Sequence, residues 1–232
     1  IRDSLNLGAG RVVYQDLAKI NMAVEQNTLK DEAVLKDAFA YAKANNKAVH
    51  FVGLVSDGGV HAHINHIEGL LNAAYEAELP KSYVHAFTDG RDVDPKSGLG
   101  FLTRVQEMCA TTNAHLASVI GRYFAMDRDQ RWERIKKAYD VLVHGIGTQT
   151  TDLTEVMQAN YDAGTTDEFI QPFALPDNGG IEGGRIKTGD VVIFFNFRTD
   201  RGRQLTQALS QKAFPEHNIC LLYTSPSPRD RN

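Results

Sequence analysis

Histidine, arginine and aspartate side chains follow two short, largely apolar runs in the first half of the chain. Residues 56–63 (SDGGVHAH) come after the run 52–55, and residues 89–92 (DGRD) come after the run 83–87. In an open parallel α/β sheet, ligands bind in the crevice outside the carboxyl ends of the strands. Two such ends that carry imidazole, guanidinium and carboxylate groups predict a site for a small anionic substrate.

Arginines recur at further expected strand ends. Arg91 lies in the second of these loops, Arg122 and Arg128 follow the run 116–120, and Arg198 and Arg201 follow the run 191–197. A guanidinium binds a carboxylate or a phosphate through two parallel hydrogen bonds, which an ammonium group cannot do. One such arginine is weak evidence, because a surface ion pair explains it equally well. The recurrence predicts a shared anion site, to which the following helix would add backbone N–H groups.

Three histidines form an H-x-H-x-x-H cluster after the first strand. We expect His61 to contact the substrate, and His63 and His66 to cap or pack against the following helix. The alternative is a metal-dependent hydrolase in which the three imidazoles hold zinc. Against this alternative, the nearest carboxylate is Asp57, and the turn at residues 58–59 directs the rings differently.

These groups require a scaffold, and the spacing of apolar residues predicts one. Short apolar runs typical of buried parallel strands alternate with segments of helical period. The expected strands are 48–55, 83–88, 116–120 and 191–197, and the expected helices are 31–46, 65–79, 97–112, 130–143, 152–163 and 201–210. This order predicts an α/β fold, a mostly parallel sheet with helices on both faces. The stretch 169–189 is expected to be an excursion over the sheet.

Composition narrows the class of protein. The chain has 232 residues, and its 42% of hydrophobic residues is ordinary for a globular protein. Its net charge of −4 argues against a general nucleic-acid surface, which is normally basic. Its two cysteines are too few for a disulfide framework. No apolar run approaches the roughly 18 residues of a membrane span, and no signal peptide opens the chain. We therefore expect a cytoplasmic protein with a small-molecule substrate and neither nucleic acid nor membrane as a partner.

Five segments in order resemble the cofactor-independent (2,3-bisphosphoglycerate-independent) phosphoglycerate mutases. They are 5–16 (LNLGAGRVVYQD), 56–61 (SDGGVH), 89–92 (DGRD), 121–129 (GRYFAMDRD) and 196–201 (NFRTDR), and the resemblance runs from about Leu5 to Asn218. It implies a glycolytic isomerase of glucose catabolism that interconverts 3-phosphoglycerate and 2-phosphoglycerate through a phosphoserine intermediate. It also implies two Mn²⁺ ions in a phosphatase-like domain, a transferase domain inserted into that domain, and a monomer.

Carried over by motif, the resemblance assigns substrate binding to seven residues of the transferase domain. Asp92 would also accept a hydrogen bond from a glycerate hydroxyl and assist proton transfer, and His61 would donate to the substrate or shuttle a proton. The seven are His61, Arg91, Asp92, Arg122, Arg128, Arg198 and Arg201. A ring of guanidinium groups suits a ligand that carries both a carboxylate and a phosphate.

The chain departs from the family at both ends. The family's nucleophilic serine falls before residue 1, and Ser4 stands where the family has a histidine. We expect residues 1–15 to be a leader from the phosphatase-like domain, 16–219 an incomplete transferase domain, and 220–232 a non-native tail. Metal ligands are expected largely outside this chain. It is then expected to bind phosphoglycerate without mutase turnover; a non-catalytic module for small anions remains the alternative.

Overall fold

Three strands with buried side chains form the centre of the sheet in the computed structural model, which describes residues 16–177 and 180–210. They are β1 (Val49–Leu54), β2 (Ser82–Thr88) and β3 (His115–Gly121), and all three run parallel. Every residue of β1 and β2 is buried. Both faces of these strands are therefore covered, as their continuous apolar runs predict.

Shorter strands complete a six-stranded sheet with the order β4-β5-β3-β2-β1-β6. β6 (Val191–Phe194) pairs parallel to β1, and β5 (Phe173–Ala174) pairs antiparallel to β3. β4 (Thr148–Gln149) pairs parallel to β5 at the edge. The sheet is mixed but mostly parallel, which confirms the expected fold class.

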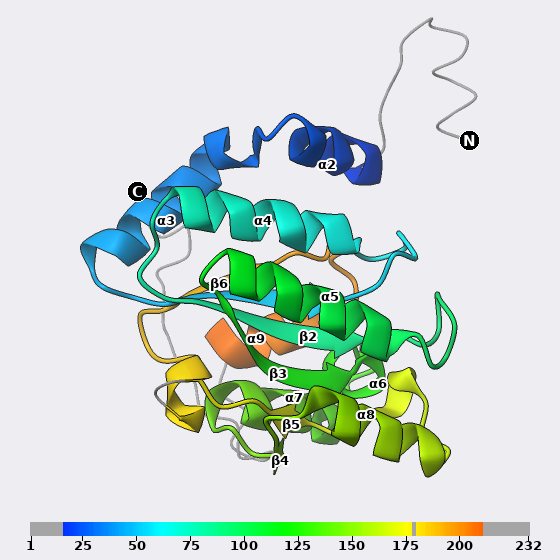
Figure 1. The fold of residues 1–232 in the computed structure, drawn as a ribbon. Helices are drawn as coiled ribbons and strands as arrows, with labels where there is room; N and C mark the ends of the chain where they lie inside the picture. Colours follow the sequence, from blue (N-terminus) through cyan, green and yellow to red (C-terminus); the bar gives the residue numbers. More distant parts are fainter. Residues whose placement is uncertain (1–15, 178–179, 211–232) are drawn as a thin grey trace, which may run out of the picture.

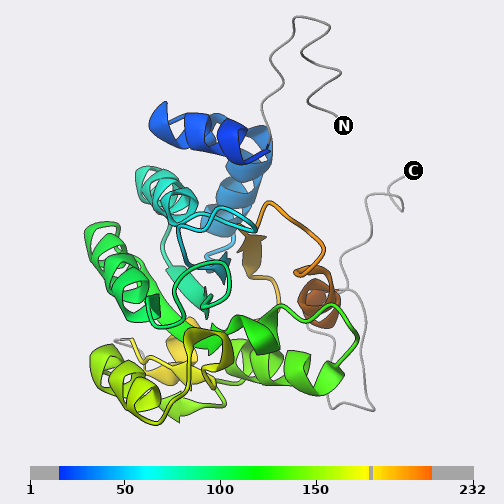
Figure 2. The ribbon, with the colours of Figure 1, turned by 90° about the vertical axis from the view of Figure 1, so that its right-hand side faces the viewer.

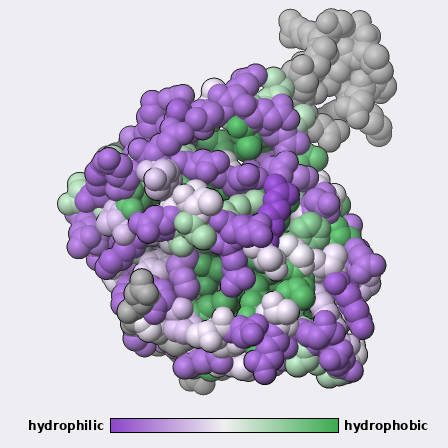
Figure 3. All heavy atoms as spheres, in the orientation of Figure 1, coloured by the Kyte–Doolittle hydropathy of each residue, from purple (hydrophilic) through white to green (hydrophobic). Residues whose placement is uncertain are grey.

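Helices cover both faces of the sheet (Figure 1). α4 (Ile64–Glu76) and α5 (Gly98–Thr111) pack on one face, and α7 (Trp132–Val143) and α9 (Arg203–Ser210) lie on the other. The chain moves from β1 to β3 in one direction and then returns to β6 beyond β1. Right-handed crossovers place the helices of the two directions on opposite faces. The outward surface of the molecule in this view is mainly hydrophilic (Figure 3).

The remaining elements lie around this core. α2 (Asp16–Glu25) packs on α4, and α8 (Leu153–Asp162) packs on α5. α3 (Ala33–Ala44) buries Phe39 and Ala42 in the core. The others are short turns of helix: η1 (Leu29–Asp31), α6 (Arg122–Ala125), η2 (Asp167–Phe169) and η3 (Ile181–Gly184). None of the described helices combines the length and apolar character that crossing a bilayer requires.

The expected elements are present, with two corrections near the carboxyl end of β6. The strand expected at 191–197 ends at Phe194, because the Asn196 side chain replaces a backbone partner: its Oδ1 accepts the Leu54 N–H at 2.9 Å. The helix expected from residue 201 begins at Arg203. The stretch 169–189 is not only an excursion, since β5 joins the sheet.

Some expectations concern residues outside those that the structure describes. These are the leader at 1–15 with Ser4, most of the motif 5–16, and the tail at 220–232.

Candidate functional site

Four loops meet at the carboxyl edge of the sheet, after β1, β2, β3 and β6. Figure 2 views the molecule from this side, so that the loops face the reader. β1 lies between β2 and β6: the chain continues from β1 to β2 on one side, and it reaches β6 on the other side only after β5. Ligands bind in α/β sheets at such a switch point. The Phe197 N–H donates to the His61 carbonyl at 2.9 Å, which ties the β1 loop to the β6 loop.

A buried ion triad forms the base of the site. Arg122 Nη1 lies 2.6 Å from Asp89 Oδ1 and 2.6 Å from Asp92 Oδ2. The side chains of Arg122 and Asp89 are only 3% and 1% exposed, and that of Asp92 is 18% exposed. Ser56, at the end of β1, donates its hydroxyl to Asp89 Oδ2 at 2.6 Å. The ends of three strands are thus joined by charge-assisted hydrogen bonds.

Asp89 also shapes the loop that presents its neighbours. Its Oδ1 accepts the backbone N–H groups of Arg91 and Asp92 at 3.2 Å and 3.0 Å, and Gly90 adopts a φ of +63°. Burial alone would raise the pKa of Asp89, but these hydrogen bonds, with those from Ser56 and Arg122, lower it. The carboxylate therefore stays charged and holds the turn.

A second carboxylate, Asp200, connects the outer arginines. Its Oδ2 accepts from Arg128 Nη1 at 3.2 Å and from Arg198 Nη2 at 3.3 Å. The two arginine side chains are 51% and 47% exposed. Its other oxygen, Oδ1, lies 4.0 Å from His61 Nδ1. Asp200 thus lies between the solvent-facing cations and the buried imidazole.

The arginines lie near one another, since Arg128 and Arg198 share one carboxylate oxygen. The pKa of Arg201 is lowered first by burial and then by the charges of Arg128, Arg122 and Arg91. Arg201 Nη1 donates to the Met126 carbonyl at 3.2 Å, which holds its side chain over the β3 loop. Guanidinium groups from the three loops after β2, β3 and β6 therefore share one region of positive potential, suited to an anion.

His61 is buried between the two carboxylates. Its Nε2 lies 4.0 Å from Asp92 Oδ2, on the opposite side of the ring from Asp200. Its pKa is lowered by burial first and then by Arg122 and Arg198, against the opposing effect of Asp92 and Asp200. The imidazole is neutral at neutral pH, and can donate from one nitrogen and accept at the other.

The structure thus brings together all seven residues that the sequence nominated for substrate binding. Four side chains that it did not nominate complete the arrangement: Ser56, Asp89, Asp200 and Glu168. Ser56 stands in the same motif as His61, and Asp89 and Asp200 stand in motifs that contain arginines, so their position was a usable signal. Glu168, whose Oε1 lies 3.4 Å from Arg91 Nη1, comes from η2 and has no such signal.

The other two histidines do not join His61. His63 is the N-cap of α4, and its Nδ1 accepts the Asn65 N–H at 3.2 Å. His66 is buried, with Nε2 2.7 Å from Asn21 Oδ1. Across residues 16–177 and 180–210, no three histidine, cysteine or acidic side chains are grouped to hold a metal ion. The zinc hydrolase alternative is therefore wrong for this cluster.

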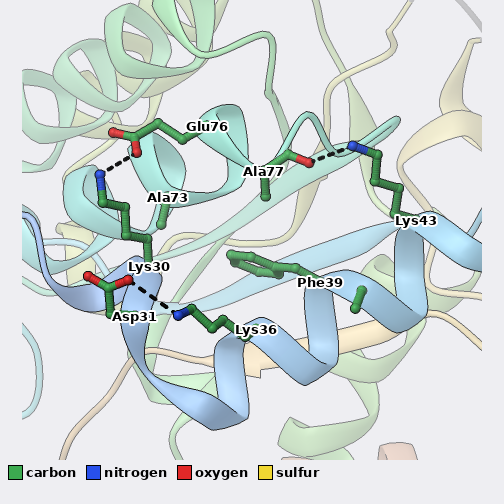
Figure 4. A pocket seen from close by; sticks show the side chains of 9 residues that line it. Lys30, Asp31, Lys36, Phe39, Lys43, Ala73, Glu76 and Ala77 are labelled. Carbon is green, nitrogen blue, oxygen red and sulfur yellow. Dashed lines mark hydrogen bonds and ion pairs between the residues drawn. The ribbon is translucent and has the colours of Figure 1, made fainter.

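A hollow of about 370 Å³ lies elsewhere, between α3 and α4 (Figure 4). Three lysines line it, yet each already has an oxygen partner. Lys30 Nζ is 2.7 Å from Glu76, and Lys36 Nζ is 3.3 Å from Asp31. Lys43 Nζ donates to the Ala77 carbonyl at 3.3 Å. These partners leave the hollow less suited to an anion than the loop edge.

Comparisons with known proteins agree with the motifs. A family model described as "BPG-independent PGAM N-terminus" matches residues 20–227. The chain is 58% identical over 215 residues to the 2,3-bisphosphoglycerate-independent phosphoglycerate mutase of Flavobacterium johnsoniae, covering 93% of this chain and 43% of that protein. For the protein of the same name from Onchocerca volvulus, the identity is 44% over 215 residues, covering 91% and 41%.

A solved structure is similar as well. It is a crystal structure of Leishmania mexicana phosphoglycerate mutase at low cobalt concentration, with a TM-score of 0.82 and 27% sequence identity. The match covers 92% of this chain and 41% of that one. The present chain therefore spans about two fifths of the length of these relatives.

Proposed function

The chain belongs to the family of 2,3-bisphosphoglycerate-independent phosphoglycerate mutases, and from this premise we propose that it binds the glycerate and phosphate groups of 3-phosphoglycerate and 2-phosphoglycerate. The whole enzyme would then be a glycolytic isomerase that moves the phosphoryl group between the two hydroxyls through a phosphoserine intermediate. This chain contributes the transferase part, residues 16–219.

One observation carries the proposal: guanidinium groups from the three loops after β2, β3 and β6 converge on one carboxyl edge, where Arg201 lies within electrostatic reach of Arg128, Arg122 and Arg91. Phosphoglycerate carries two anionic groups on three carbons, so it can engage several guanidiniums at once. Arg122 is held in place by the carboxylates of Asp89 and Asp92 and lies at the base of the site. Arg91, Arg128 and Arg198 are about half exposed and are free to turn toward a ligand.

The acid–base groups suit a hydroxyl that gains and loses a phosphoryl group. Asp92 is partly exposed, and its carboxylate can accept a hydrogen bond from that hydroxyl. His61 is neutral, and its Nε2 lies 4.0 Å from the Asp92 carboxylate. It can therefore donate a hydrogen bond to the same ligand or take up a proton from it. Both side chains are held by loops that the sheet positions.

We assign the nucleophile and the metal ligands to parts of the enzyme other than the residues that the structure describes. Ser56 is buried and donates its hydroxyl to Asp89, which suits a structural role and not attack on a phosphate. The family implies two Mn²⁺ ions, and the described residues offer no group of three suitable ligands. The proposed binding of phosphoglycerate therefore involves no metal held by the described residues. A coupled assay of the 232-residue polypeptide alone is expected to give no mutase turnover.

Titration calorimetry with 3-phosphoglycerate tests the binding role. Arg198→Gln and Arg201→Gln should each raise Kd about 10- to 100-fold, because a charge-assisted hydrogen bond contributes roughly 1.5–3 kcal/mol. Arg104→Gln is the matched control, since Arg104 pairs with Glu68 on the helical surface. Unchanged affinity in both site variants would contradict the proposal. Equal affinity for inorganic phosphate would favour the non-catalytic anion-binding module.

A further inference from the structure

We propose that Asp200 is a positioning residue for His61: it bridges Arg128 and Arg198 while the site is free, and turns to the imidazole Nδ1 when an anion takes those arginines. The inference rests on the proposed function, because it assigns a further residue to the same site. It concerns a carboxylate that acts through His61 and does not itself hold the ligand.

Two buried polar atoms that face each other are the first observation. His61 Nδ1 and Asp200 Oδ1 are 4.0 Å apart. Within the described part of the chain, neither atom has a hydrogen-bond partner. A buried polar atom without a hydrogen-bond partner destabilises the state that contains it, because its hydration is lost and not replaced. Closing the gap by about 1 Å would give both atoms a partner at ordinary hydrogen-bond distance.

The second observation explains why the gap is open. The other oxygen of Asp200 is engaged by Arg128 at 3.2 Å and by Arg198 at 3.3 Å. Both arginine side chains are about half exposed, so a ligand can reach them from solvent. A phosphate has three acceptor oxygens and carries more negative charge than a carboxylate does. It therefore competes well with Asp200 for both guanidinium groups. Asp200 is then released toward the imidazole.

The exchange has a chemical consequence for His61. A carboxylate on Nδ1 fixes the proton there and leaves the Nε2 lone pair directed toward Asp92 and the ligand. Four charged groups face the ring: Asp92 and Arg122 from the β2 and β3 loops, and Arg198 and Asp200 from the β6 loop. With Arg198 drawn to the ligand and Asp200 closer, the ring becomes more basic. Ligand binding thus prepares His61 to accept a proton.

NMR of ¹⁵N-histidine-labelled protein, with and without 3-phosphoglycerate, tests this. In the parent chain, the ligand should shift His61 to the Nδ1–H tautomer and raise its pKa by about one unit. Asp200→Asn should abolish most of both changes. The same variant should bind 3-phosphoglycerate as tightly as the parent or up to a few-fold more tightly, because a competing anion is removed. Asp57→Asn, an exposed carboxylate in the His61 loop, is the control.

The outcomes separate this inference from the proposed function. Binding of 3-phosphoglycerate with an unchanged His61 resonance in the parent chain would overturn the inference alone. So would an Asp200→Asn variant that keeps the tautomer shift, or one that loses affinity tenfold as a direct ligand contact would. No binding of 3-phosphoglycerate would overturn the proposed function and this inference with it.

Discussion

Arg122 contributes to stability as well as to the site, because its buried guanidinium lies between the buried carboxylate of Asp89 and the partly exposed carboxylate of Asp92. A buried ion pair gains little over a well-packed apolar pair, but losing one partner leaves an uncompensated charge. Here one guanidinium serves both Asp89 and Asp92 at 2.6 Å. The two loops after β2 and β3 are therefore held by a single side chain.

Replacing this guanidinium by an apolar side chain should be costly. We expect Arg122→Met to lower the free energy of unfolding by about 3–5 kcal/mol, since two acidic groups lose their counter-charge. Urea unfolding followed by circular dichroism measures this. Arg104→Met is the control: its pair with Glu68 is 44% exposed on both sides and is worth less than about 1 kcal/mol. Similar losses in the two variants would argue against a special role for the buried triad.

At the scale of elements, η2 packs between the start of α5 and the ends of β2 and β3, from which two of the site loops begin. Asp167 is fully buried, and its Oδ2 accepts the Gly98 N–H at 2.7 Å at the N-terminus of α5. The Asp167 carbonyl accepts the Thr88 hydroxyl at 2.7 Å at the end of β2. The backbone of η2 also passes close to Gly121 at the end of β3. This short segment thus sets the spacing of the loops that carry Arg91 and Arg122.

A methyl group at Gly121 should disturb the close contact between the end of β3 and the backbone of η2. A Cβ there would lie 2.3 Å from the Glu168 carbonyl oxygen and 2.7 Å from the Ile170 nitrogen, both backbone atoms. We expect Gly121→Ala to destabilise the fold by about 1–3 kcal/mol, as overpacking does, and to weaken phosphoglycerate binding because Arg122 follows directly. Thermal unfolding and calorimetry measure the two effects.

Gly100 offers the matched control for this substitution. It lies in α5, and a Cβ there meets nothing within 4 Å. Gly100→Ala should stabilise the protein by about 0.5–1 kcal/mol, since alanine favours the helix. Two alanine variants with opposite signs would separate local crowding from the general effect of glycine replacement. A neutral Gly121→Ala would mean that η2 yields without cost.

The strand ends were predictable, whereas the elements that brace them were not. Runs such as 52–55 are apolar because both faces are covered, so the loop residues after them could be placed at one edge. α2 was not predicted, because none of its residues is buried and its sequence therefore shows only a weak apolar stripe. Glu168 was not predicted because its partner Arg91 lies 77 residues away. β4 and β5 have two residues each, too few for a detectable period.

Across the whole molecule, a buried polar chain crosses the three central strands. His50 Nδ1 and His85 Nε2 are 2.9 Å apart, and His85 Nδ1 lies 2.7 Å from Ser118 Oγ. At the other end, His50 Nε2 lies 3.3 Å from Asp190 Oδ2, just before β6. The contact between His50 Nδ1 and His85 Nε2 has room for one proton only, so it holds as long as at least one of the two imidazoles is neutral. Protonating both rings places two N–H groups face to face and breaks this link between β1 and β2.

Acid should therefore destabilise the fold. Burial, the largest cause, lowers the pKa of His50 and His85 below the ordinary value of 6.5, and burial with His63 lowers that of His66 to about 4. The unfolded chain then binds more protons than the folded one below pH 6.5. Stability is complete above that pH and falls as the pH drops toward the folded pKa values, with a slope of up to about 1.4 kcal/mol per pH unit for each histidine.

Urea unfolding between pH 8 and pH 5 measures this dependence. The parent chain should lose stability progressively below about pH 6.5, where histidines titrate in the unfolded state. His85→Gln should flatten the curve because one proton-linked group is gone, whereas His144→Gln, at an exposed position after α7, should keep the parent slope. If His85→Gln does not fold, the pH profile of the parent chain still tests the prediction. Constant stability of the parent from pH 8 to pH 5 would show that the buried histidines accept protons without cost.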